Sequence, residues 1–366
     1  MKKVWKIILI STASVVLLTL ITLGIIVVIF FGSPMSNKRV TAHAVPEHDN
    51  RLGNTSANLM NSGYACAMGE DILLATGKGL TLIDGDTMES SVYIDIPYSY
   101  SPHINVMGDT VTMLSYNYDT IGNDVYRYDG QSLKKIFKDS CFRYTFNHMQ
   151  IIDDVTYTAG NYIAMLNKQN RQIGFKTEYH PSNPMYWDEN IYYWAPDTDT
   201  HTHQLYRYHI PTAKNTAVGI HFDASVRYSF VHEGCIYYSY NYKDIHEVWV
   251  YDISEHTTKR FLTSDHELMV HNIIHHSLII SEETDDKDYV MLYLYNMKSK
   301  YKTELENCYR NFIGVHVVND TVIINRFFEM IDSGGAQYAF YDNHGEYVGC
   351  VNQWNGQWVD EVKPAP

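Results

Sequence analysis

The sequence contains few cysteines and no paired cysteine motif. Its 366 residues include five, and none of them forms a CxxC pair: Cys66, Cys141, Cys235, Cys308 and Cys350. So few and so scattered thiols exclude a disulfide-stapled scaffold. Most of them lie in apolar, strand-like contexts such as GCIYY and VGCV, so we expect buried free thiols.

Glycine, proline and positive charge are also limited. The 21 Gly and 10 Pro are too few to indicate a disordered or fibrous protein. Lys and Arg total 28 against 42 Asp and Glu, which gives a formal net charge of −14. This balance excludes nucleic acid as an expected partner, because binding to phosphates depends on Lys and Arg. Cationic ligands or partners are favoured instead.

Known catalytic and cofactor motifs are missing from the chain. There is no GxSxG, HExxH, P-loop or dinucleotide fingerprint and no sialidase Asp box, and neither a WD dipeptide nor a kelch-type double glycine recurs from repeat to repeat. We therefore expect no cofactor, dinucleotides included. An enzyme is not excluded, but a non-catalytic role is favoured.

The first feature that is present is a long apolar run near the N-terminus. Residues 7–31 carry no charge, and at 1.5 Å per residue a helix of this length spans roughly 37 Å, enough to cross a bilayer. Ala42-His43-Ala44 has the form of a signal cleavage site but lies far downstream. We predict a cytoplasmic stub (1–6), a single transmembrane signal anchor (7–31) and a juxtamembrane linker (32–58). The rest of the chain is then expected on the outer face of the cell membrane.

The second feature is a repeat that runs through the remaining chain. Seven fragments share an alternating apolar strand that ends in a small polar residue, and their last residues lie 38 to 46 positions apart: TLID (81–84), YRYD (126–129), AMLN (164–167), YRYH (206–209), WVYD (249–252), YLYN (293–296) and AFYD (339–342). A period near 40–45 residues with several short strands is typical of a β-propeller blade. The pattern predicts an all-β, seven-bladed propeller of four-stranded antiparallel sheets.

The repeat also suggests where the propeller begins and ends. Blades run from 59 to 352, followed by a C-terminal tail (353–366). Each blade reads as strand, polar turn, strand, variable loop, anchor strand, turn and strand. The closing of the ring is left open, because either the linker around Val40–Val45 or the tail Gln353–Val359 could supply an extra strand.

A resemblance follows from blades four to six. IYYW (191–194) and IYYS (236–239), followed by LYRY (205–208) and VWVY (248–251), resemble repeats of bacterial extracytoplasmic propellers of unknown function. Those repeats are in turn similar to the YWTD propeller of lipoprotein-receptor proteins. The resemblance implies the fold and leaves the function open.

Candidate binding residues lie in the loops that propellers commonly use. Loops between second and third strands are acidic, and loops between blades are aromatic, so both sets are expected on one rim. Carboxylates beside aromatic rings suit a glycan, a cation or a basic peptide, whereas the alternative is a set of solvated loops that keep the protein soluble. The candidates are Tyr98, Tyr100, Tyr144, Tyr186, Trp187, Asp244, Asp285 and Asp286.

A metal site is not expected, although one loop offers weak candidate ligands. APDTDTHTH (195–203) carries Asp197, Asp199, His201 and His203, but it lacks the spacing of a calcium loop. The favoured function is therefore a membrane-anchored, non-catalytic module that binds a protein partner or a cell-envelope glycan. The alternative is a carbohydrate-active enzyme, a glycosidase or lyase, that uses carboxylates on the same face.

Overall fold

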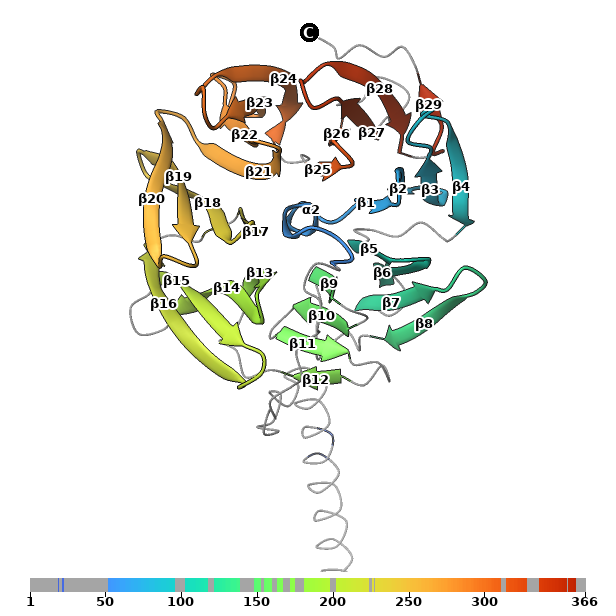
Figure 1. Cartoon of the computed structure of the whole chain (residues 1–366), viewed down its shortest axis with the longest axis horizontal. Helices are drawn as coiled ribbons and strands as arrows, with labels where there is room; N and C mark the ends of the chain where they lie inside the picture. The colour runs from blue at the N-terminus through green and yellow to red at the C-terminus, as the bar shows by residue number, and fades with distance from the viewer. Residues whose placement is uncertain are drawn as a thin grey trace, which may run out of the picture.

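The computed structural model describes residues 52–95, 103–117, 122–138, 148–152, 155–159, 163–166, 172–174, 181–197, 202–223, 226, 228–310, 314–327, 336–353 and 355–359, together with Thr19 and Thr22. Within these residues the strands form seven antiparallel sheets, and only strands that follow each other in sequence pair. The sheets stand around a ring whose centre holds the short helix α2 (Ser56–Met60) (Figure 1).

The strands of the first four sheets are β1 (Ala65–Met68), β2 (Asp71–Thr76), β3 (Gly79–Ile83) and β4 (Ser90–Asp95); β5 (His103–Met107), β6 (Thr110–Asn117), β7 (Gly122–Tyr128) and β8 (Leu133–Lys138); β9 (His148–Ile152), β10 (Val155–Ala159), β11 (Ile163–Leu166) and β12 (Gln172–Gly174); β13 (Ser182–Trp187), β14 (Asn190–Asp197), β15 (Thr202–His209) and β16 (Lys214–Phe222). Those of the other three are β17 (Ser229–His232), β18 (Cys235–Tyr242), β19 (Ile245–Asp252) and β20 (Thr257–Ser264); β21 (Leu268–Ile274), β22 (Ser277–Glu283), β23 (Tyr289–Asn296) and β24 (Lys302–Tyr309); β25 (Gly314–Val318), β26 (Thr321–Phe327), β27 (Ala336–Tyr341), β28 (Tyr347–Asn352) and β29 (Trp358–Val359).

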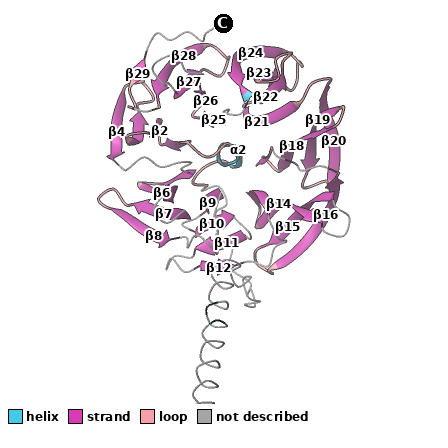
Figure 2. Ribbon diagram, turned by 180° about the vertical axis from the view of Figure 1, so that it is seen from behind, coloured by secondary structure: helices cyan, strands magenta, loops and turns pink. Residues whose placement is uncertain are grey.

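Strand side chains are buried on both faces because each sheet lies between two neighbours. In β18, Ile236 and Tyr238 pack with the fourth sheet, whereas Tyr237 packs with the sixth. Side chains alternate along a strand, so a strand between two sheets must be apolar on both parities. This explains why the chain needs so many tyrosines and aliphatic residues. Seen from behind, strands again surround the single central helix (Figure 2).

Each of the seven anchor fragments belongs to the third strand of a sheet or to the residue that follows it, and Asn167 lies outside the described residues. Asp252 Oδ1 accepts hydrogen bonds from the backbone N–H groups of Ser254 (2.9 Å) and Glu255 (3.0 Å). The same turn follows Asp84 and Asn296. Asp and Asn favour such turns because the side chain replaces a backbone acceptor. The repeated polar residue therefore fixes the hairpin between third and fourth strands.

The structure corrects the prediction that all sheets have four strands. The last sheet has five, because β29 pairs with β28. The tail also contacts the first sheet: Trp358 N–H donates to Ser90 Oγ (3.2 Å), and Gly77 N–H donates to the carbonyl of Gln353 (2.6 Å). Of the two closures left open by the sequence, the tail is the one that joins the last sheet to the first. The other, Val40–Val45, lies outside the described residues.

The end of the predicted linker, residues 52–58, lies inside the ring. Asn54 Nδ2 donates to the carbonyls of Ala65 (2.9 Å) in β1 and Ile104 (2.8 Å) in β5. Asn58 donates to the carbonyl of Val317 (3.0 Å) in β25 and accepts from its N–H group (2.9 Å). Ser56 Oγ accepts from Val231 N–H (3.3 Å) in β17. We call residues 52–63 the central segment, since it binds innermost strands around the ring.

The structure also corrects the predicted transmembrane helix and the predicted single-span partnership with a membrane. Among the described residues, no helix is long and apolar enough to cross a bilayer. Of the predicted span 7–31, Thr19 and Thr22 are the described residues. The expected extracytoplasmic location of the propeller depends on the rest of that span and stays a prediction.

The described cysteines are free thiols. Cys66, Cys308 and Cys350 are buried and Cys235 is half-buried, while Cys141 lies outside the described residues. Burial raises the pKa of the Cys66 thiol to about 12. These four cysteines therefore act as small apolar side chains.

Four histidines in the innermost strands, around the centre of the ring, are uncharged. Burial lowers the pKa of His103 to about 4 and of His271 and His316 to about 3, and it lowers that of His148 well below its ordinary value. His103 Nδ1 accepts from Met149 N–H (3.0 Å), and His316 Nε2 accepts from Tyr64 N–H (2.9 Å). Protonation of either ring nitrogen would break the bond it makes.

We predict acid-induced unfolding from these histidines. As pH falls below about 6.5, these histidines become protonated in the unfolded chain but stay neutral in the folded chain. Each histidine therefore lowers the free energy of unfolding by about 1.4 kcal/mol per pH unit. The loss continues down to the folded-state pKa values, about 4 and 3. Urea unfolding between pH 7 and pH 4 should show it. His316→Gln should make the free energy of unfolding depend less steeply on pH, whereas the exposed His275→Gln should leave that dependence unchanged. If both variants kept the slope of the unmodified protein, the interpretation would be wrong.

A second prediction concerns Asn58. Its Oδ1 also accepts from Asn272 Nδ2 (2.8 Å), so Asn58→Ala leaves several buried donors and acceptors without partners. We expect the free energy of unfolding to fall by about 3–5 kcal/mol. Urea denaturation measures this, with the exposed Asn307→Ala as the control, expected to change stability by less than about 0.5 kcal/mol. If Asn58→Ala lowered the free energy of unfolding by as little as the control variant does, the central segment would not be what holds the sheets together.

Candidate functional site

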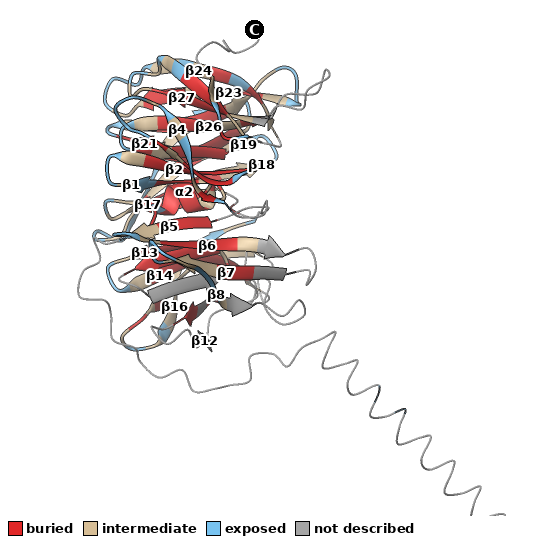
Figure 3. Ribbon diagram, turned by 90° about the vertical axis from the view of Figure 1, so that its right-hand side faces the viewer, coloured by how far each residue is buried: buried red, intermediate tan, exposed pale blue. Residues whose placement is uncertain are grey.

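Strand direction assigns every loop to one of two faces of the ring. Turns between second and third strands and connections between sheets lie on one face, which we call the 2–3 face. Turns between first and second and between third and fourth strands lie on the opposite face, because successive strands are antiparallel. Figure 3 shows the ring edge-on, with buried strands between the two rows of loops.

The predicted binding residues do not all share one face. Tyr98, Tyr100 and Tyr144 lie outside the described residues. Asp244, Asp285 and Asp286 are exposed in 2–3 loops, as expected. The remaining two lie elsewhere, so the predicted set is split.

Tyr186 and Trp187 belong to β13 and not to a loop between sheets. Tyr186 is 3% exposed and packs in the core. Trp187 is the last residue of β13, beside the turn to β14, and therefore lies on the opposite face. Its ring lies close to Gly234 in the turn between β17 and β18. Trp187 thus cannot share a surface with the acidic 2–3 loops.

Other aromatic residues occupy the 2–3 face between the fourth and fifth sheets. Phe222 ends β16 and stacks on Tyr240 of β18, with ring centroids 4.4 Å apart and planes 28° apart. Tyr240 in turn stacks with Tyr242 at 6.4 Å and 30°. All three are half-buried. We call Phe222, Tyr240 and Tyr242 the aromatic ladder; it continues the buried contact of Trp194 with Tyr238 (5.3 Å) toward solvent.

Carboxylates lie beside the aromatic ladder. Burial raises the pKa of the Tyr240 phenol, and the nearby charge of Asp223, the Tyr242 phenol and the charge of Glu247 raise it further. Asp223 is exposed next to Phe222, and Asp244 is exposed at the tip of the β18–β19 hairpin. Beside it, Lys243 Nζ lies 4.9 Å from the centre of the Tyr242 ring. The ladder already holds one cation of the protein against an aromatic face.

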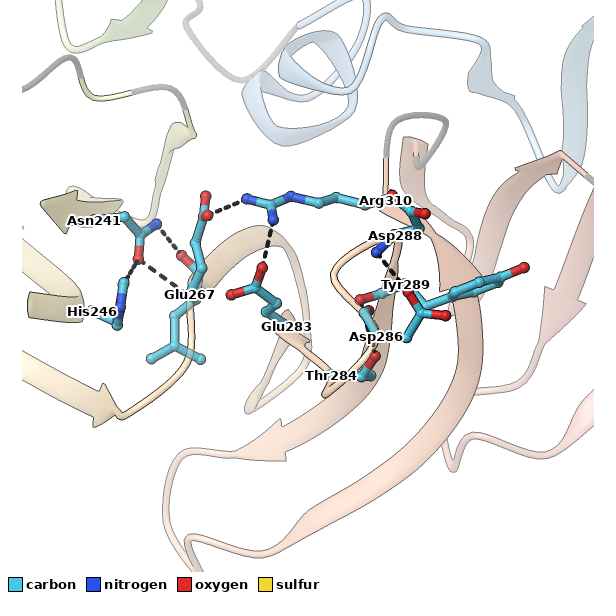
Figure 4. Close-up of polar contacts among 10 residues, drawn as sticks. Asn241, His246, Glu267, Glu283, Thr284, Asp286, Asp288, Tyr289 and Arg310 are labelled. Carbon is cyan, nitrogen blue, oxygen red and sulfur yellow. Dashed lines mark hydrogen bonds and ion pairs between the residues drawn. The ribbon is translucent and has the colours of Figure 1, made fainter. Parts of the chain in front are cut away.

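The same surface continues onto the sixth sheet through polar contacts (Figure 4). Asn241 at the end of β18 donates to the carbonyl of Leu268 (2.6 Å) and accepts from its N–H group (3.1 Å). His246 Nδ1 lies 3.1 Å from Asn241 Oδ1. These bonds fix the β18–β19 hairpin against the start of β21.

Arg310 joins two carboxylates at this point. Its guanidinium binds Glu283 (2.8 Å) and Glu267, and its backbone N–H donates to the carbonyl of Asp288 (2.8 Å) (Figure 4). The two glutamates converge, as a glycosidase pair would, but both are engaged by the same cation. Their geometry is that of a clamp which holds the β22–β23 loop.

The β22–β23 loop itself presents free acidic groups. Thr284 Oγ1 donates to the carbonyl of Asp286 (2.8 Å), and Asp286 Oδ1 accepts from Asp288 N–H (3.1 Å). Asp285, Asp286 and Asp288 are exposed, and no ion pair between described residues involves them. We call the aromatic ladder with Asp223, Asp244 and Glu247, together with this loop, the acidic–aromatic rim.

The candidate metal ligands are only partly described. Asp197 ends β14 and is half-buried, and His203 lies in β15, where burial lowers its pKa. Asp199 and His201 lie outside the described residues. In the part of the chain that is described, no group of three or more His, Cys, Asp or Glu residues is arranged to hold a metal.

We predict that no metal at Asp197 and Asp199 is needed for folding. Packed sheets of this size bury enough apolar surface to be stable without an ion. Asn substitution at both positions should leave the melting temperature nearly unchanged, and a chelator should have no further effect. A large drop with chelator that the double variant abolishes would show a structural metal instead.

Comparisons with known proteins give the fold and no family. No protein-family model and no curated protein matches this sequence. Among solved structures, puromycin hydrolase matches 89% of this chain and 57% of its own with a TM-score of 0.57 at 9% identity. A puromycin-hydrolysing peptidase of Mycobacterium tuberculosis matches 81% and 55%, with a TM-score of 0.50 at 10% identity. The extracellular domain of BT4673 from Bacteroides thetaiotaomicron matches 68% and 33%, with a TM-score of 0.46 at 16% identity.

These matches confirm the resemblance to bacterial β-propellers, and at such identities the likeness concerns the fold alone. The narrower resemblance to the YWTD-type propeller is not specifically shown. This chain spans little more than half of both puromycin-hydrolysing proteins. In its described part the chain is therefore similar to bacterial β-propellers and is assigned to no family.

Proposed function

We propose that this protein is a non-catalytic binding module that holds a basic segment of a partner protein on its acidic–aromatic rim. The observation that carries the proposal is the aromatic ladder beside the exposed Asp223 and Asp244. Glu247 is already paired with Arg260 (3.0 Å). Aromatic faces and carboxylates together attract Lys and Arg side chains. Lys243 over Tyr242 shows that a cation fits there.

The charge of the whole protein supports the same kind of partner. A net charge of −14 attracts cationic molecules and speeds their encounter, and the exposed carboxylates of the β22–β23 loop extend the negative surface across the sixth sheet. For this reason we favour a peptide over the cell-envelope glycan that the sequence left open.

The enzyme alternative has weaker support. A glycosidase needs two carboxyl groups that face one substrate pocket. Glu267 and Glu283 converge but are bound to Arg310, and the central segment lies at the centre of the ring. The hydrolases and lyases among similar structures share the fold and carry no argument about chemistry.

The test uses a labelled peptide of alternating Lys and Gly and measures its binding by fluorescence anisotropy. Asp223→Asn with Asp244→Asn should weaken binding by about fivefold to tenfold, because two rim charges are lost. Tyr242→Leu should weaken it by a similar factor through loss of the cation–π contact. Affinity should also fall as salt is raised.

A matched control removes the same charge from the opposite face. Asp86→Asn with Glu89→Gln lies in the β3–β4 turn and is exposed, so it should leave affinity nearly unchanged. Equal losses in both double variants would mean that only net charge matters. Binding or turnover of an oligosaccharide that Tyr242→Leu abolishes, with no affinity for the peptide, would favour the carbohydrate-active alternative.

A further inference from the structure

A small pocket opens on the opposite face, at the other end of the contact between the fourth and fifth sheets. Its volume is about 290 Å³, and its lining is polar: Asp188, Glu189, Asn190, Arg207, His209, Thr212, Lys214 and Thr216. The residues come from β14, β15 and β16 and from the two turns that join β13 to β14 and β15 to β16. No residue of the acidic–aromatic rim takes part.

The register of the fourth sheet brings these side chains together. Asn190 pairs with His209 and His209 with Lys214, while Arg207 pairs with Thr216. Residues two apart on a strand share a face, so Arg207 and His209 point to one side together with their partners. The pocket is therefore built into the strands.

Hydrogen bonds fix the two turns that wall the pocket. The β13–β14 turn has positive φ at Asp188 (43°) and Glu189 (63°), as a two-residue hairpin requires. Ile210 N–H donates to the carbonyl of Glu189 (2.9 Å) and links one turn to the other. His209 Nδ1 lies 2.8 Å from Thr212 Oγ1. A ligand would meet a site that is already formed.

The pocket contains two cations, Arg207 and Lys214, in formal balance with the carboxylates of Asp188 and Glu189. Glu189 lies 3.5 Å from His209 Nε2. No ion pair between described residues involves Arg207 or Lys214. Arg207 lies beside the Tyr192 phenol, a neutral group whose pKa burial raises to about 12. Arg and Lys are the charged donors that a tetrahedral oxyanion takes.

The pocket is larger than an oxyanion and offers acceptors as well. Its volume corresponds to roughly ten water molecules. Inorganic phosphate alone would leave most of that space empty. Asp188 and Glu189 contribute carboxylates, and Asn190 Oδ1 is a buried acceptor without a hydrogen-bond partner among the described residues. Such acceptors suit hydroxyl groups and disfavour a second anionic group.

We propose that this pocket binds a small phosphorylated polyol of the size of a hexose phosphate. Arg207 and Lys214 hold the phosphate, and Asp188, Glu189 and Asn190 accept hydrogen bonds from the hydroxyls of the polyol. The site is independent of the peptide surface proposed above, because the two lie on opposite faces of the ring.

Isothermal titration calorimetry at constant ionic strength tests the proposal, with glucose 6-phosphate, inorganic phosphate and glucose as probes. We expect saturable binding of glucose 6-phosphate, at least about tenfold weaker binding of phosphate and no binding of glucose. No saturation by glucose 6-phosphate up to about 10 mM would overturn the proposal. Equal affinity for phosphate and glucose 6-phosphate would overturn the assignment of a polyol.

Variants identify the pocket as the site. Lys214 is exposed, so Lys214→Gln should fold normally and weaken binding of glucose 6-phosphate by about tenfold. Arg207→Gln should weaken it further, and Lys214→Gln decides the matter if Arg207→Gln does not fold. The exposed Lys259→Gln in β20 removes the same charge outside the pocket and should leave affinity unchanged. Unchanged affinity in Lys214→Gln would overturn the proposal.

Discussion

The hydrogen bonds of three asparagines in the channel are the interaction on which the ring depends. Asn54, Asn58 and Asn61 reach backbone groups in the innermost strands of the first, second, sixth and seventh sheets. Inner strands have one edge without a strand partner, and their N–H and C=O groups would otherwise face a narrow channel. Amide side chains satisfy donors and acceptors at once. The sheets are thereby held to a common centre as well as to their neighbours, and the loops on both faces take their positions from that arrangement.

Much of the fold could be predicted from the sequence because its signals are local. Six of the seven anchor fragments end in Asp or Asn, and at Asp252 the side chain is the acceptor that the next turn needs. The central segment was missed because its sequence, with several Asn and Ser, has the composition of a linker. Those polar side chains serve contacts with residues more than two hundred positions away, such as Asn58 with Val317, and no local pattern reports such a partner.

The candidate site was predicted less well, for reasons visible at two places. The segment HPSNPMYW resembles a loop because it holds two prolines, yet Pro184 lies in β13 where the register shifts between Ser182 and Met185. Proline is tolerated in such an irregular inner strand. Trp187 is the last residue of this strand and therefore lies on the face opposite to the one predicted. By contrast, Tyr238, Tyr240 and Tyr242 alternate along one strand, a period of two that predicts a shared side. That spacing could have identified the aromatic ladder; the stacking on Phe222 could not, since it depends on how two sheets meet.

The central segment precedes all the sheets in sequence and β29 follows all the other strands, and this order has a consequence for synthesis. The central segment leaves the ribosome before any of the seven sheets, and β29, which joins the last sheet to the first, leaves after the other strands. Contacts of such high sequence separation make folding slow, and a nascent chain carries sheets with open edges until the tail is released. Translation speed and chaperone supply therefore bear on the yield of this protein more than on that of a domain with short-range contacts.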